Sequence, residues 1–110
     1  MVLIIRKRAT ASELEEMLME FGMFIKLAVD IERRILAGGG EMHYYCEQEL
    51  LADGSKQKDI WGAGFEPDTQ EITYDSLINI RAPQNRSMEI GDSIIRERVA
   101  EIVIELLGGI

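Results

Sequence analysis

The sequence contains few of the residues that would assign it to a specific class of protein. Cys46 is the only cysteine among 110 residues, so an intramolecular disulfide is excluded. Acidic residues outnumber basic ones by 20 to 12. The net charge of -8 argues against a nucleic-acid binder, because such binding depends on neutralising phosphates. His43 is the only histidine, which leaves little room for acid–base chemistry near neutral pH.

Long hydrophobic runs are also missing. No apolar stretch approaches the ~18 residues that a membrane-spanning helix needs. The run Val2–Ile5 is too short for the core of a signal peptide, and basic residues follow it rather than precede it. We therefore expect a cytoplasmic protein without a membrane-spanning helix.

What the sequence does have is the composition of one globular domain. Hydrophobic residues make up 46% of the chain, which is ordinary for a folded protein. A chain of 110 residues is long enough for one hydrophobic core. Because it contains no repeats, linkers or low-complexity segments, we expect a single domain over residues 1–110.

Hydrophobic periodicity predicts five strands and three helices. Residues 25–32 alternate between hydrophobic and polar, which is typical of a half-buried strand. Leu14, Met17 and Phe21 recur at helical spacing after two candidate N-caps, Thr10 and Ser12. The candidate N-cap of the last helix is Asp92 or Ser93. The predicted strands are residues 2–5, 25–32, 35–41, 59–66 and 71–81, and the predicted helices are residues 12–22, 43–52 and 94–107. This order, β-α-β-β-α-β-β-α, predicts an α+β fold with a mainly antiparallel five-stranded sheet and helices on one face.

Several separated segments resemble, in order, a family of short prokaryotic proteins known only as a domain of unknown function. The matching segments are VDIE, GGEMH, GSKQKDIWG, SLINIR, and NRS followed by IR. The resemblance covers nearly the whole chain. It implies a single cytoplasmic domain and assigns no activity, cofactor or catalytic residue.

The stretch AGGGEMHYYCE and the strand before it contain the residues that suggest a metal site. Asp30, Glu32, Glu41 and His43 are expected near one end of the hairpin formed by residues 25–32 and 35–41. Carboxylate and imidazole groups are ligands for divalent metals, so a divalent metal cofactor is one hypothesis. The alternative is a strand exit in which the glycines permit positive φ and Cys46 packs as a small hydrophobe.

The stretch NIRAPQNRS is a local exception to the acidic average. It contains five ligand-binding candidates: Asn79, Arg81, Asn85, Arg86 and Ser87. Two arginines at this spacing can fork around a carboxylate or phosphate. The alternative is that the arginines form ion pairs with nearby glutamates and anchor the loop.

The last predicted helix, Ile94–Leu107, has a wide apolar face. One sheet in so small a domain does not obviously cover all of it, so a homodimer formed through this helix is one expectation. Its alternative is coverage by the first helix within the monomer. Three functional hypotheses follow: a non-enzymatic binding or regulatory module, a small metal-assisted hydrolase, and a domain that binds proteins through the last helix. We place the binding module first, because no nucleophile–base pair is evident.

Overall fold

A computed structural model describes all residues, 1–110, and contains one five-stranded antiparallel sheet. The strand order is β1-β3-β2-β4-β5, so β2 is central and β1 and β5 are the edges. The strands are β1 (Leu3–Ile5), β2 (Ile25–Asp30), β3 (Ile35–Gly38), β4 (Ile60–Glu66) and β5 (Glu71–Thr73). The helices are α1 (Ala11–Leu18), α2 (His43–Ala52) and α3 (Ser93–Leu107), with 3-10 turns at Gln57–Asp59 and Leu77–Asn79. The predicted α+β class, element order and antiparallel sheet are confirmed.

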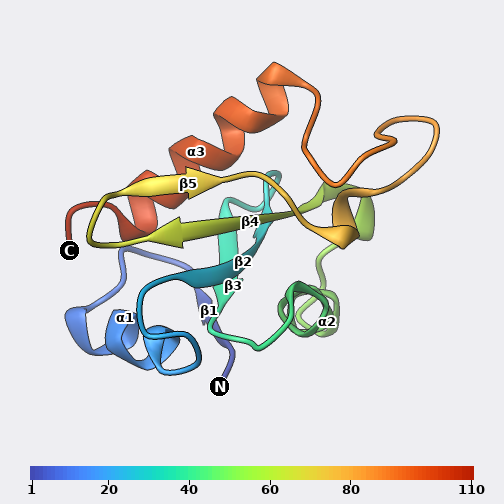
Figure 1. Cartoon of the computed structure of the whole chain (residues 1–110). Coiled ribbons are helices and arrows are strands. Elements are labelled where there is room, and N and C mark those ends of the chain that lie inside the picture. The colour runs from blue at the N-terminus through green and yellow to red at the C-terminus, as the bar shows by residue number, and fades with distance from the viewer.

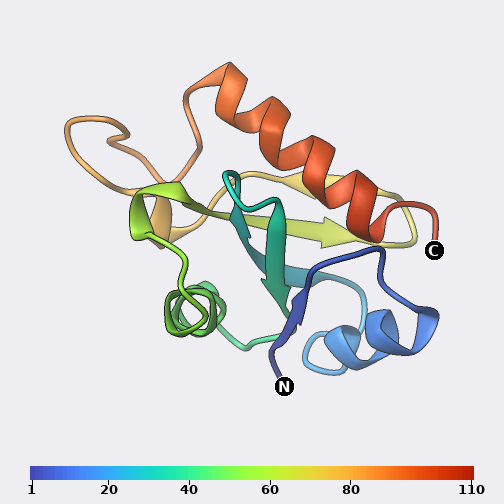
Figure 2. The ribbon, with the colours of Figure 1, turned by 180° about the vertical axis from the view of Figure 1, so that it is seen from behind.

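The helices cover both faces of the sheet. Leu27 and Val29 of β2 face a core that also contains buried residues of α1 and α3. Ala28, between them, faces the opposite side and joins a smaller core with Cys46 and Leu50 of α2. Figures 1 and 2 show α3 and α2 on opposite sides of the strands. The prediction that all helices cover one face of the sheet is therefore wrong. Helix α2 packs on the other face, against small residues such as Ala28 that the sequence pattern assigns to the polar side of β2.

The hairpin forms as the sequence indicates, and Thr10 and Asp92 are the cap candidates that the structure uses. β2 and β3 pair in antiparallel register, and Arg34 in the turn between them has a φ of 56°. The side-chain oxygen of Thr10 accepts a hydrogen bond from the N–H of Glu13, which completes a capping box at the start of α1. Asp92 caps α3 by accepting from the N–H groups of Ile94 and Ile95. Polar side chains at these positions therefore satisfy helix N–H groups that lack a partner within the helix.

The strand predicted over residues 71–81 is correct only for its beginning. β5 pairs with β4 through three register positions and ends at Thr73. Beyond it the chain no longer pairs with β4: Asp75 bridges to Glu89, Ser76 is still extended, and the turn Leu77–Asn79 follows. The reason is a side chain: Asn79 bonds to the edge of β4 at Gly62, where a continuing strand would otherwise have paired.

Candidate functional site

Asn79, the first of the five ligand-binding candidates, bonds to the main chain. Its side chain is fully buried, with 0% exposure. The amide oxygen accepts from the N–H of Gly62 at 2.8 Å, and the amide nitrogen donates to the carbonyl oxygen of Gly62 at 3.0 Å. The same nitrogen lies 3.1 Å from the carbonyl oxygen of Met88. Asn79 thus gives the edge of β4 the two hydrogen bonds that a neighbouring strand would supply.

Arg81 also donates hydrogen bonds to main-chain carbonyl groups, one of them at the start of β4. Its guanidinium donates to the carbonyl oxygens of Ile60 at 2.7 Å and Ile78 at 2.9 Å, and it lies 4.0 Å from the ring centre of Trp61. Burial lowers the pKa of Arg81, and the neighbouring Glu47 opposes that shift. The predicted ion pairing with exposed glutamates is therefore replaced by bonds to carbonyl groups and stacking on an indole.

The remaining candidates of this stretch lie in the loop after Arg81. The amide nitrogen of Asn85 donates to the carbonyl oxygens of Asn79, Ser87 and Glu89, and its oxygen accepts from the N–H of Gly91. Ser87 is exposed and its hydroxyl donates to the carbonyl oxygen of Glu89. Arg86 is exposed and forms no ion pair. Ligand binding at this loop stays a prediction, and the contacts of the two asparagines are accounted for by the fold.

The four metal-ligand candidates do not converge. No group of three or more His, Cys, Asp or Glu side chains is placed to hold a metal ion. The buried carboxylate of Asp30 accepts from the N–H groups of Glu32 and Arg33, and Glu32 pairs with Arg98 at 3.3 Å. The divalent-metal hypothesis therefore has no geometric support from these residues.

His43 opens helix α2 and turns one ring nitrogen towards the sheet. Its Nε2 lies 2.9 Å from the carbonyl oxygen of Ala63. A carbonyl only accepts, so Nε2 carries the proton and Nδ1 is left as an acceptor. Burial lowers the pKa of His43; the nearby Lys26 lowers it further, while Asp75 and the bond to Ala63 act in the opposite direction. His43 is therefore a neutral imidazole with a fixed tautomer near neutral pH.

The lowered pKa of His43 predicts a pH-dependent stability. The pKa of His43 is lower in the folded protein than the ordinary value of 6.5, which the unfolded chain keeps. The unfolded chain therefore binds the proton more readily, and the free energy of unfolding falls as the pH decreases below about 6.5. We expect His43→Gln, whose amide can still donate to Ala63, to remove this part of the loss. The measurement is urea unfolding of both proteins at about pH 7.5 and about pH 5.5. An equal loss in both proteins would show that His43 does not contribute.

Cys46 and the glycines before it behave as the structural alternative predicts. Cys46 is buried, and burial raises the pKa of its thiol to about 11, so the thiolate needed for metal binding or nucleophilic attack does not form near neutral pH. Gly38 ends β3, and Gly39 has a φ of +97°. The stretch AGGG is a strand exit into α2, as predicted.

The main hollow of the surface is a groove that none of the predicted sites describes. It has a volume of about 560 Å³ and lies on the α2 side of the sheet. Its apolar lining comes from the start of α2, the segment after β5 and the following loop: Met42, Tyr44, Leu77, Ile78 and Met88. Lys26, His43 and Asp75 add polar groups. We call this hollow the central groove.

Two features of the sequence could have indicated the groove. β4 contains Gly62, and a glycine within a strand marks a place where another group approaches closely; that group is Ser76, which lines the groove. The chain also has six methionines, of which only Met17 is buried. Exposed methionines are common at binding surfaces because their unbranched side chains adapt to different partners.

Comparison with known proteins identifies a family but assigns no activity to it. The family model described as "Protein of unknown function (DUF5674)" matches residues 3–106. No curated protein and no solved structure matches the chain. None of the helices has the length and apolarity needed to cross a membrane.

Proposed function

Because the chain belongs to this family of unknown function, we propose a function from the groove itself: a cytoplasmic, non-enzymatic module that binds an apolar segment of a partner protein. The observation that carries the proposal is the exposure of apolar side chains around one concave surface. Leu77, with 68% exposure, stands at one wall, and Met42, Tyr44 and Met88 are also exposed. Contiguous exposed apolar surface on a small protein is typical of an interaction site.

The groove favours a segment of a protein over a contact with a flat surface. Its apolar lining is contributed by three different parts of the chain, so the apolar side chains converge from both walls. The polar groups at His43 and Lys26 lie among them, and Nδ1 of His43 is an acceptor. A mostly apolar lining with a small number of directed polar groups is the usual composition of a binding site.

Binding through the central groove predicts that peptides selected on this protein depend on the groove. We would select a displayed library of random peptides on the wild-type protein and measure the affinity of the enriched peptides. The Leu77→Asp/Met88→Asp variant places charges on exposed positions of the groove, so we expect it to fold and to bind these peptides roughly tenfold more weakly or worse.

The matched control changes two exposed apolar residues of α3 on the opposite side of the sheet. Ile94→Asp/Ile104→Asp should leave peptide binding unchanged. If this control abolishes binding and the groove variant does not, the interaction runs through the last helix instead. Peptides that bind both variants equally would overturn the proposal.

The homodimer expected through Ile94–Leu107 stays a prediction. Five apolar residues of α3 are already buried within the monomer, and they are Val99, Ile102, Val103, Leu106 and Leu107. Ile94 and Ile104 are exposed by 64% and 58%, and the exposed Glu97 and Glu101 lie between them along the helix. A two-fold contact through this stripe would bring glutamates together, which weakens it as the main interaction surface.

A further inference from the structure

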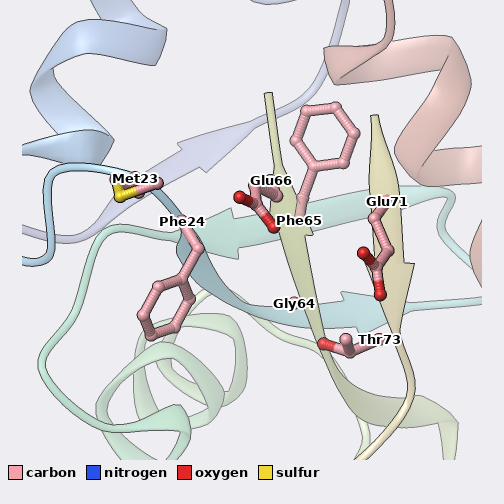
Figure 3. A pocket seen from close by; sticks show the side chains of 7 residues that line it. All are labelled: Met23, Phe24, Gly64, Phe65, Glu66, Glu71 and Thr73. Carbon is pink, nitrogen blue, oxygen red and sulfur yellow. The ribbon is translucent and has the colours of Figure 1, made fainter. Parts of the chain in front are cut away.

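A second, smaller pocket continues the central groove along β4. It has a volume of about 270 Å³, and its lining includes Phe24, Gly64, Glu66, Glu71 and Thr73 (Figure 3). The two hollows are neighbours, because Lys26 of the central groove is the register partner of Gly64 in this pocket. We call the second hollow the acidic pocket.

Two glutamates without a cationic partner define the chemistry of the acidic pocket. Glu66 and Glu71 are register partners at the end of the β4–β5 ladder. Neither forms an ion pair within the chain. The ammonium of Lys26, which lines the neighbouring groove, donates to the carbonyl oxygen of Glu41 and lies over the ring of Phe21. Like charges opposite each other destabilise a sheet, so a cation brought by a partner would relieve the repulsion.

The rest of the acidic pocket suits the stem of a long basic side chain. Figure 3 shows Phe24 on one side of Gly64 and Thr73 on the other. Gly64 has no side chain, so the hydroxyl of Thr73 comes within 2.5 Å of the position that a Cβ would take there. The ring of Phe24 is stacked on Phe21, with ring centres 4.7 Å apart, and both rings are exposed, so they present an apolar wall to solvent. Lysine and arginine bury their aliphatic stems on such surfaces and hold their charged ends near carboxylates.

We propose that the acidic pocket binds a lysine or arginine side chain of the same partner segment whose apolar residues occupy the central groove. This inference rests on the proposed function. A Cβ at Gly62 would overlap the side chain of Ser76 and lie 3.0 Å from Ile78, so Gly62 marks where the central groove meets β4. From Gly62 to Glu66 the strand rises about 13 Å, so the basic residue lies about four residues of extended chain from the apolar anchor. A second copy of this protein is disfavoured as the occupant, because its net charge of -8 repels it.

The test uses the peptides selected on the wild-type protein and determines at which positions they carry lysine or arginine. We expect enrichment of lysine or arginine about four residues from an apolar residue. A selected peptide and its copy with glutamine at the basic position are then titrated against the wild type and Glu66→Gln/Glu71→Gln. The variant should bind the basic peptide roughly tenfold more weakly than the wild type does. The two proteins should bind the glutamine copy with equal affinity. Salt should weaken only the binding of the basic peptide.

The control removes the same number of charges elsewhere. Glu97→Gln/Glu101→Gln changes two exposed glutamates of α3 and should leave both peptides unaffected. Equal weakening by this control would show that net charge alone is responsible, and would overturn the inference. Groove-dependent peptides without basic residues would also overturn it while leaving the proposed function intact. If no peptide depends on the groove, both fail.

Discussion

Asn79→Ala is expected to lower the free energy of unfolding by about 3 to 5 kcal/mol, a large share of the stability of so small a domain. The substitution leaves the N–H and the carbonyl oxygen of the buried Gly62 without their partners and removes the bond to Met88. A buried polar group without a partner costs more than the hydrogen bond itself gives. The measurement is urea unfolding with the midpoint and slope fitted separately.

Gln84→Ala is the matched control for this prediction. Gln84 lies in the same loop but is exposed, so the change should stay within about 0.5 kcal/mol of the wild type. If Asn79 were instead a ligand-binding residue with no part in the fold, both variants would unfold at the same urea concentration. That outcome would return Asn79 to the ligand hypothesis that the sequence suggested.

The second large effect is expected at Gly39, in the stretch AGGG. Its φ is +97°, and a Cβ there would lie 2.6 Å from the carbonyl oxygen of Met1 and 3.0 Å from the Cα of Met17. Gly39→Ala therefore combines backbone strain with overlap against backbone atoms that cannot turn away. We expect a loss of about 2 to 4 kcal/mol in the free energy of unfolding.

Gly54→Ala separates the two contributions to this loss. Gly54 has a similar φ of +105°, but a Cβ added there would meet nothing within 4 Å. It should lose only the cost of the backbone conformation, about 1 to 2 kcal/mol. Thermal or urea unfolding of both variants checks the comparison. Equal losses at the two positions would mean that the chain near Met1 and Met17 moves aside and that the close approach carries no penalty.

The candidate sites were harder to predict than the helices and strands, because the same residue types can bind a ligand or form hydrogen bonds that stabilise the fold. Asparagine and arginine at 79 and 81 have the hydrogen-bonding groups that recognise anions, and the structure uses those groups on carbonyl oxygens of the chain itself. The central groove was missed for the opposite reason. Its lining residues are separated along the sequence, from Lys26 to Met88, and none of them belongs to a recognisable motif.

The sequence by itself determined the local elements of this protein. Alternation in β2, helical spacing in α1 and α3, and the caps at Thr10 and Asp92 depend on residues a few positions apart. The strand exit at AGGG was also predictable, because positive φ at a non-glycine residue is costly. These features follow from short-range sterics and hydrogen bonding, which depend only on residues that are close together in the sequence.

Only the tertiary structure decided which surfaces meet. The coverage of Ala28 by α2, the end of β5 at Thr73, and the pairing of Asn79 with Gly62 each join segments far apart in the chain. A side chain's periodicity tells which face it occupies, but not what packs on that face or which main-chain group its amide reaches. The open groove between α2 and the segment after β5 arises where this long-range packing leaves apolar side chains uncovered.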